Sequence, residues 1–414
     1  MIIKTNNAYF SSNLENIIFT LLLFIPLSFF FGSAFLNLIL AVLFFIFIFS
    51  IKRKEIFHLI FNSDFKFIFF FCFYLIINSL LNYLDLQTFL KSISYLRFPI
   101  LMVIFLYLFK NISGKKKDLW ANINIIFLII ISLDLLFQYF IGKNSIGFLP
   151  GMCGENYLKD KAVCTRYSGF FNDEFIMGGY LSTIFFSIIL FINSIKKKWS
   201  LITIIIIFFI YILIMITGER SATLTILLTL FFIFLQYKIN YRFKIISLLI
   251  LSFLTILMVN LNPHVKGRFI NFFDHDMKKN NHLSTFQKFA TTPWGLHSQK
   301  SLRLFLDKPI IGHGLKSFRV KCDDYNLYFD RLEKKHRACS THPHNLIMEL
   351  LSEQGIIGLI LFFSFFFIIF KRSFEKNGFY NEDLSLIALR SLIFVLIFIP
   401  KPVGSIFSSI NATM

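Results

Sequence analysis

A short polar stretch, residues 339–358, stands out in a chain that is otherwise rich in Phe, Ile and Leu. It holds His342 and His344 on either side of a proline, followed by Asn345 and Glu349. Because proline fits the first turn of a helix, the spacing predicts a helix with His342, Asn345 and Glu349 on one face and His344 pointing elsewhere. A histidine of near-neutral pKa that is oriented by a carboxylate can act as a general base.

Two other interpretations of the histidines stay open. His342 or Thr341 can simply cap the helix. Alternatively, a His-x-His pair with a glutamate is a set of metal ligands. We expect no metal, because no third histidine lies nearby on that helix.

A second polar element, Thr217–Ala222, reads TGERSA and lies between two strongly apolar runs. Gly218 permits a break there, and Ser221 can cap the helix that follows. Arg220 then projects beside a helix N-terminus, where the dipole and the free N–H groups favour an anion. The alternative is a tight hairpin in which Glu219 and Arg220 face water.

Two further arginines lie near the ends of apolar runs. Arg166 precedes Asp173 and Glu174, two carboxylates that suit the N-terminus of a helix on dipole grounds alone. Its guanidinium can reach the same helix end, or it can be an exposed loop residue. Arg97 lies at the outer end of another run, where a snorkelling side chain is the common explanation.

Membrane helices must position these groups. Hydrophobic residues make up 56% of the 414 residues and charged residues 16%, whereas a soluble domain carries roughly 25% charged residues. Apolar runs of about 18 residues or more recur, and each can cross a ~30 Å hydrocarbon core as a helix. The predicted fold is an all-α, polytopic transmembrane helix bundle of about 11 or 12 spans. The spans are expected at residues 15–31, 34–51, 65–81, 96–110, 121–141, 174–195, 199–217, 221–236, 244–260, 345–370 and 384–400.

Charge sets the topology. A cluster of Lys and Arg lies in every second connection, and such clusters mark cytoplasmic loops. Residues 142–173 and 261–344 are then on the outer side, and the chain divides into a bundle at 1–260, the large loop at 261–344 and C-terminal helices at 345–414. The large loop holds 15 Lys and Arg against 7 Asp and Glu, which indicates an anionic partner. Mere solubility of the loop is the alternative.

Cysteine usage agrees with this sidedness. Cys72 lies within an apolar run, and the other four of the five cysteines fall in the two outer loops. An even count on the oxidising side predicts disulfides, here Cys153–Cys164 and Cys322–Cys339. Metal ligation is less favoured, because no C-x-x-C spacing occurs.

Three stretches carry a family resemblance. Residues 340–358 resemble the histidine signature of the bacterial O-antigen ligase and O-antigen polymerase (Wzy-type) superfamily. Residues 307–319, DKPIIGHGLKSFR, resemble its P-x-x-G-x-G stretch, and residues 217–222 resemble its G-x-R-S element. The order and spacing match from about residue 65 to residue 410.

This resemblance implies a chemistry. Family members are metal-independent, inverting glycosyltransferases that need no cofactor and move a glycan from undecaprenyl diphosphate to a sugar hydroxyl. By motif, Arg220 matches the first arginine that holds the diphosphate. His342 is the expected base and His344 its support.

One departure from the family pattern concerns the second arginine. Many members carry it about fifteen residues before the motif proline, and residues 292–300 offer His297 and Lys300 there but no arginine. Arg268, Arg303 and Arg319 are the nearest substitutes. The expected substrate-binding residues are therefore Arg220, Arg97, Arg166, His297, Arg319, Asn345 and Glu349.

Together the residues and the resemblance predict an O-antigen ligase. It would act in the bacterial inner membrane, with its active site facing the periplasm and lipid A-core as acceptor, and it would bind no nucleic acid. A polymerase with the same chemistry is the nearest alternative. A transporter is the alternative from another class, but it would place charges mid-span, and the centres of 199–217 and 244–260 hold none.

Overall fold

The structure is a computed structural model, and its described residues form helices joined by turns and short connections. It describes residues 12–50, 61, 65–151, 166–172, 175–195, 200–238, 240–271, 284–290, 292–324, 339–375, 384–399 and 404–408. Within these ranges no strand occurs, and the one β-type contact is an isolated antiparallel bridge between Gly151 and Arg166.

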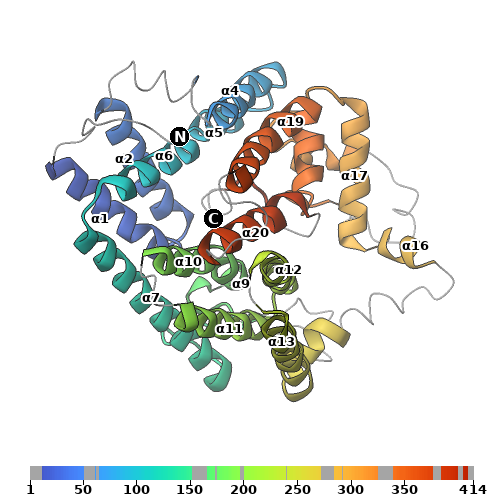
Figure 1. The fold of residues 1–414 in the computed structure, drawn as a ribbon. Helices are drawn as coiled ribbons and strands as arrows, with labels where there is room; N and C mark the ends of the chain where they lie inside the picture. The colour runs from blue at the N-terminus through green and yellow to red at the C-terminus, as the bar shows by residue number, and fades with distance from the viewer. Residues whose placement is uncertain are drawn as a thin grey trace. The chain divides into compact units, whose positions relative to one another are not determined.

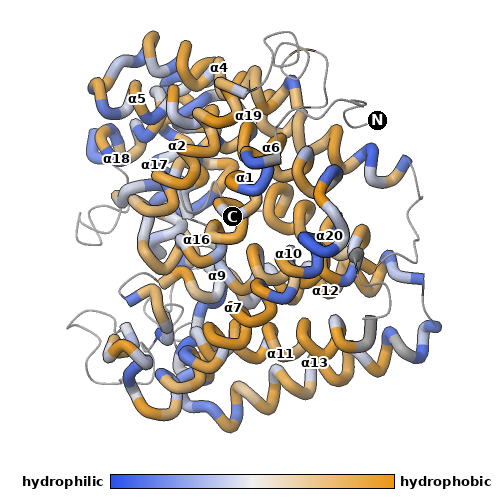
Figure 2. Tube along the Cα trace, turned by 90° about the vertical axis from the view of Figure 1, so that its left-hand side faces the viewer, coloured by the Kyte–Doolittle hydropathy of each residue, from blue (hydrophilic) through white to orange (hydrophobic). Residues whose placement is uncertain are grey.

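The apolar runs are helices, as predicted. They are α1 (Ser12–Ser28), α2 (Ser33–Ser50), α4 (Lys66–Leu81), α6 (Arg97–Asn111), α7 (Gly114–Ile141), α10 (Phe186–Ile195), α11 (Ser200–Thr217), α12 (Arg220–Gln236), α13 (Tyr241–Leu261), α19 (Leu346–Glu375) and α20 (Leu384–Phe398). Among the described residues, five helical stretches are long and apolar enough to cross a membrane: Ser33–Ser50, Leu86–Phe109, Gly114–Ile141, Lys244–Leu261 and Leu346–Glu375. The all-α membrane fold is confirmed, and α11 and α13 are hydrophobic along most of their length (Figure 2).

The chain forms two compact units. Unit 1 comprises residues 1–112, 282–371 and 400–413. It contains α1, α2, α4, α6 and nearly all of α19, together with α5 (Leu86–Ser94), α16 (Thr285–Ala290), α17 (Pro293–Asp307), α18 (Phe318–Lys321) and the 3-10 turn η5 (Cys322–Asp324). In this unit α4 packs on α5, and α2 packs on α6.

Unit 2 comprises residues 113–281 and 372–399. Its helices α7, α10, α11, α12, α13 and α20 are joined by the shorter elements η2 (Gly169–Phe171), α9 (Met177–Tyr180), η3 (Leu181–Phe185), α14 (Pro263–Lys266) and η4 (Gly267–Asn271). In this unit α12 and α20 lie side by side (Figure 1). The first helix after residue 174 is continuous through α9, the π-helical η3 and α10.

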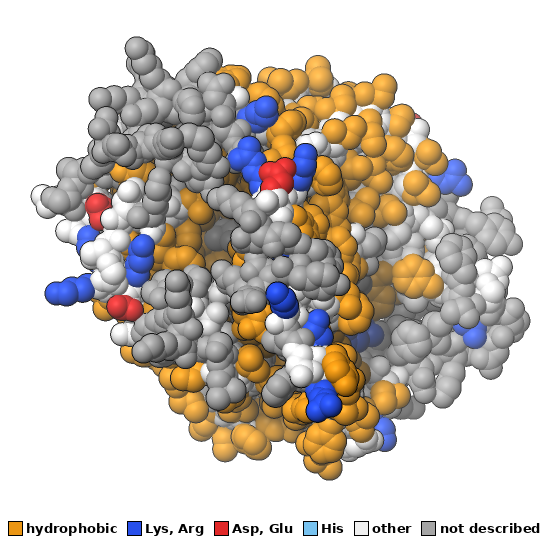
Figure 3. All heavy atoms as spheres, viewed as in Figure 1, with side chains coloured by type: hydrophobic (Ala, Val, Ile, Leu, Met, Phe, Trp, Pro, Cys, Tyr) orange, Lys and Arg blue, Asp and Glu red, His pale blue; other side chains and the backbone are white. Residues whose placement is uncertain are grey.

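Large hydrophobic side chains are exposed on many of these helices. Phe49, Phe140 and Leu261 are 83%, 75% and 74% exposed, and hydrophobic side chains cover much of the described surface in the view of Figure 3. A soluble protein rarely exposes contiguous apolar patches of this kind. Such exposure of apolar side chains is typical of helices that face lipid.

The stretch at residues 309–314 docks by its backbone onto a break in α19. Gly355 has φ +64° and ψ −168°, so α19 is interrupted there. The N–H of Gly314 donates to the carbonyl of Glu353 at 2.8 Å, and the N–H of Ile356 donates to the carbonyl of Pro309 at 2.9 Å. A Cβ on Gly355 would lie 2.3 Å from a carbonyl oxygen of this stretch. The motif glycines therefore permit two backbones to meet.

Candidate active-site clusters

The TGERSA element forms a tight break between α11 and α12. Gly218 has φ +71°, and Glu219 is extended, with φ −86° and ψ 94°. Helix α12 therefore begins at Arg220, with Glu219 in the N-cap position. The prediction that Ser221 caps this helix is wrong, because the positive φ of Gly218 ends the turn two residues earlier.

Glu219 uses its carboxylate to bind another helix. Its side chain makes no capping bond to α12. Instead Oε1 accepts the N–H of Gly178 at 2.6 Å, and Oε2 accepts the N–H of Gly179 at 3.2 Å. These N–H groups lie in the first turn of α9, which has no intrahelical partner for them. The alternative in which Glu219 simply faces water is therefore wrong.

Arg268 and Arg166 lie beside the same break. Arg268 is 1% exposed, and its Nε donates to the carbonyl of Gly218 at 3.2 Å. Arg166 is held by paired backbone hydrogen bonds with Gly151, both 2.9 Å, and its guanidinium carbon lies 4.9 Å from the centre of the Phe175 ring. Because three cations converge here, we call Arg166, Arg220, Arg268 and Glu219 the arginine cluster.

The charged groups of this cluster lie close enough to shift one another's pKa. The pKa of Arg268 is lowered to about 9 by burial and by the neighbouring Arg166 and Arg220, against the opposing effect of Glu219. Burial also lowers the pKa of Arg166, while Glu219 raises it. For Glu219, burial raises the pKa to about 7, although two backbone hydrogen bonds, Arg166 and Arg268 favour its ionised form. The cluster therefore has an excess of positive charge.

A buried polar network on α7 holds the segment that carries Arg166. Oδ1 of Asp134 accepts the N–H of Ser145 at 2.9 Å. Oε1 of Gln138 accepts the N–H of Gly169 at 2.8 Å, and Nδ2 of Asn144 donates to the carbonyl of Gly169 at 3.0 Å. Burying a polar group without a hydrogen-bond partner costs free energy of folding. The network thus fixes Ser145 and Gly169, which lie before and after Arg166 in the chain.

Three histidines gather in unit 1. The ring centres of His342 and His344 are 4.0 Å apart, and those of His344 and His297 are 5.4 Å apart and stacked. His297 lies on α17 and is 5% exposed. We call these residues the histidine cluster. The sequence placed His297 near a substrate site only by its position relative to the motif, and the structure gives it a direct contact with a motif histidine.

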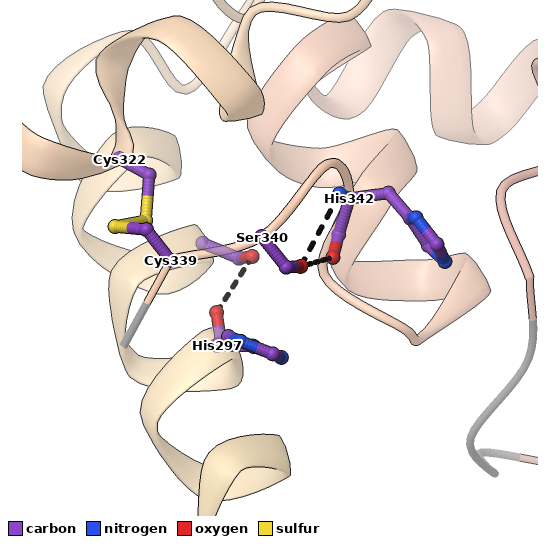
Figure 4. Close-up of a disulfide and its surroundings, with 6 residues drawn as sticks. His297, Cys322, Cys339, Ser340 and His342 are labelled. Atoms are coloured by element: carbon purple, nitrogen blue, oxygen red, sulfur yellow. Dashed lines mark hydrogen bonds between the residues drawn. A yellow bond between two sulfur atoms is a disulfide. The ribbon is translucent and has the colours of Figure 1, made fainter. Parts of the chain in front are cut away.

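A disulfide anchors the chain just before this cluster. Cys322 and Cys339 are bonded, as predicted, and the bond packs in a small buried core with Leu304 and Phe318. The hydroxyl of Ser340 donates to the carbonyl of His342 (Figure 4). Cys72 is free and buried. The predicted pair Cys153–Cys164 and the predicted helix-opening residues Asp173 and Glu174 lie outside the described residues.

Helix α19 begins later than its proline suggests. Its first residue is Leu346, and Oδ1 of Asn345 accepts the N–H of Met348 at 3.1 Å, which makes Asn345 the cap. His344 has φ +56°, a left-handed conformation that no helix interior allows. The predicted start at Pro343 and the shared face of His342, Asn345 and Glu349 are therefore wrong. His342 lies in the turn before the helix.

Glu349 and Glu353 hold backbone segments. The carboxylate of Glu349 accepts the hydroxyl of Ser405 and, at 3.0 Å, the N–H of Ile406. Glu353 accepts the N–H of Lys316 at 2.6 Å. These contacts give Glu349 a structural partner near the C-terminus.

The other expected arginines lie elsewhere in unit 1. Arg97 begins α6, and its Nη2 donates to Oδ1 of Asn37 at 2.8 Å. Arg319 lies on α18 close to Lys316, whose pKa is lowered by burial and by neighbouring cations that include Arg319. In the described part of the chain, no group of three His, Cys, Asp or Glu residues is arranged to hold a metal ion.

Comparison with known proteins relates part of the chain to a protein family. Residues 202–363 match the family model described as O-antigen ligase. Over this segment the chain is similar to O-antigen ligases. An 89-residue region is 34% identical to a Rickettsia conorii protein named "Putative polysaccharide ligase". The match covers 21% of this chain and 21% of that relative, so it spans about a fifth of the relative's length.

The resemblance carried by the three motifs is thus confirmed. The matched segment includes Arg220, Arg268 and the whole histidine cluster, whereas Arg166 precedes it. Sequence reasoning named Arg268 only as a substitute and gave Glu219 no role. A signal for Arg268 existed: the Asn-Pro pair at 262–263 starts the short helix that leads into it.

Proposed function

We propose that this protein is an inverting glycosyltransferase that transfers a polysaccharide from undecaprenyl diphosphate to a sugar hydroxyl. The observation that carries the proposal is the arginine cluster at the start of α12, in a chain whose segment 202–363 matches the O-antigen ligase family. We further propose that the acceptor is lipid A-core and that the reaction takes place at the periplasmic face of the inner membrane.

The arginine cluster suits a diphosphate for three reasons. Arg268 lies close to Arg166, Arg220 and Glu219, so the site holds more positive than negative charge and attracts an anion. Arginine presents a planar fork of donors that matches phosphate oxygens, and it stays charged. The N-terminus of α12 adds the positive end of the helix dipole. Fixed cations of this kind stabilise the charge that develops on a diphosphate leaving group.

The histidine cluster suits proton abstraction. In the proposed reaction His342 removes the proton of the acceptor hydroxyl as its oxygen attacks the anomeric carbon, and the bond to the diphosphate breaks. His344, 4.0 Å away between ring centres, supports His342. The electron pair leaves with the diphosphate, so no covalent glycosyl-enzyme intermediate is needed. A general base contributes typically ~10²–10⁴-fold to the rate.

The first test changes the fork of donors and keeps the charge. Arg220→Lys should lose most transfer activity, measured as glycan transferred from the lipid-linked donor by purified protein at equal amounts. Arg242→Lys is the matched control. Arg242 lies at the start of α13 beside the exposed Tyr241, and it is not a member of the arginine cluster. Full activity of Arg220→Lys would refute a bidentate role for this arginine.

A second test identifies the acceptor. In a deletion strain, a ligase defect abolishes long-chain lipopolysaccharide while the lipid-linked polymer accumulates. A polymerase defect instead leaves lipopolysaccharide that carries a single repeat. Gel analysis of lipopolysaccharide separates these outcomes, and the second would overturn the ligase proposal while leaving the transfer chemistry in place.

A further inference from the structure

Glu219 is the one carboxylate of the arginine cluster, and the proposed reaction gives it no task. It is held by two N–H groups of α9, at 2.6 and 3.2 Å. The same carboxylate is close to Arg166 and Arg268. A negative charge inside an anion-binding site competes with the anion, so its presence needs a reason.

The reason follows from the charges before and after binding. Without a ligand, burial lowers the pKa of Arg268, and repulsion from Arg166 and from Arg220 lowers it further. An ionised Glu219 offsets that repulsion. A lipid-linked glycan diphosphate is a diester that brings two negative charges, and like charges at close range in a partly buried site repel strongly. Protonation of Glu219 removes this repulsion, and burial already disfavours its charged form.

We propose that Glu219 becomes fully protonated, with the proton drawn from solution, when a lipid-linked diphosphate occupies the arginine cluster. This makes it a positioning residue whose charge is exchanged for that of the donor. This inference rests on the proposed function. The carboxylate becomes a carboxyl group, and no other bond forms or breaks. The protonated group can still accept the N–H groups of α9, so the helix start stays in place.

The groups that face Glu219 are few among the described residues. The cations that act on it are Arg166 before η2 and Arg268 on η4, and Arg220 on α12 acts in turn on Arg268. The N–H groups of Gly178 and Gly179 on α9 bind its carboxylate, and the hydroxyl of Thr217 on α11 accepts its backbone N–H. Asp173 and Glu174 precede α9 outside the described residues. Because Glu219 is the carboxylate in contact with α9, it is the first group expected to take up the proton.

The experiment counts protons. The purified protein is titrated with farnesyl-diphosphate-linked N-acetylglucosamine, a diphosphate diester that carries no titrating group near neutral pH. Calorimetry in two buffers of different ionisation enthalpy gives the number of protons bound per ligand. Since the pKa of Glu219 is about 7 without ligand, about half a proton should be taken up near pH 7. Affinity should rise as the pH falls from about 8 to about 6, by about tenfold for each unit by which the ligand raises the pKa.

Glu219→Gln provides the matched comparison. It keeps the size of the side chain and one acceptor oxygen but cannot titrate, so it should bind the probe with no proton uptake and with pH-independent affinity. Arg242→Lys should behave as the wild type. A purely structural role for Glu219 would alter stability but not the proton count.

The outcomes separate the two proposals. If the wild type binds the probe without proton uptake, or if Glu219→Gln takes up as many protons as the wild type, the inference is overturned and the proposed function stands. If the wild type does not bind the probe at all, the diphosphate site is wrong and the proposed function falls with it. The wild-type measurement decides the matter even if Glu219→Gln does not fold.

Discussion

Two adjacent glycines allow a sharp test of how the arginine cluster is assembled. Gly178 and Gly179 both lie in α9, and both donate their N–H groups to Glu219. A Cβ on Gly178 would lie 2.8 Å from Oγ1 of Thr217, 2.9 Å from Cβ of Glu219 and 3.0 Å from Cβ of Ala222. A Cβ on Gly179 would meet no atom within 4 Å. Alanine is therefore expected to be harmful at one position and harmless at the next.

The size of the effect follows from the atoms involved. Two of the three contacts at Gly178 are Cβ atoms, which the backbone fixes, so the start of α9 and the TGERSA break must move apart. Overpacking of this kind costs typically ~1–3 kcal/mol. Glycine to alanine in a helix gains up to ~1 kcal/mol, and this gain applies to both variants. The difference between Gly178→Ala and Gly179→Ala therefore isolates the steric cost, ~1–3 kcal/mol.

The assay is thermal unfolding of the purified variants in one detergent, followed by binding of the farnesyl-linked probe. Gly178→Ala should unfold at a lower temperature than Gly179→Ala and bind the probe more weakly, since its Cβ displaces Glu219 and with it the start of α12. Gly179→Ala should match the wild type in both measurements. Equal unfolding temperatures for the two variants would refute the close packing of α9 on the break.

Three further outcomes are expected. Mass spectrometry of non-reduced peptides should find Cys322 joined to Cys339, and recovery of both as free thiols from native membranes would contradict the structure. Gly355→Ala should lower stability by about 2 kcal/mol or more, because a positive φ and a backbone clash act together. Gly114→Ala, where a Cβ would meet no atom within 4 Å, should be nearly neutral, and similar unfolding temperatures for the two variants would count against the docking of residues 309–314 on α19. His342→Ala should reduce transfer by about 10²–10⁴-fold, while the wild type should keep its activity in excess EDTA; loss on chelation with recovery on adding zinc or manganese would assign the histidines to a metal site.

The helices were predictable because the membrane imposes a length on apolar sequence. The run predicted at 65–81 is α4, Lys66–Leu81, and the run predicted at 199–217 is α11, Ser200–Thr217. Every apolar side chain in a run favours the same prediction, a membrane helix, so the prediction does not depend on any single residue. Predicted boundaries fail where one residue decides. Helix α19 begins at Leu346, three residues after the proline that was expected to start it, because the amide of Asn345 caps the helix.

The pairing of the polar groups was not predictable from local spacing. Glu219 binds N–H groups about forty residues earlier in the chain, and Glu349 binds Ile406, 57 residues later. Helical periodicity reports which residues share a face, but it does not report which other segment meets that face. Arg268 could be suspected from the sequence, yet only its hydrogen bond to the carbonyl of Gly218 places it in the arginine cluster.

The breaks at Gly218, beside the arginine cluster, and at Gly355, in α19, share one construction. Gly218 and Gly355 take φ values of +71° and +64°, and each has a glutamate within two residues. Glu219 accepts N–H groups from α9, and Glu353 accepts the N–H of Lys316. A helix interior leaves no backbone group for another segment, whereas a break frees carbonyls and turns a side chain outward. The glutamate then ties the break to backbone N–H groups that would otherwise lack partners. On this account, the short glycine-containing motifs mark the positions where a membrane helix opens and binds the backbone of another segment.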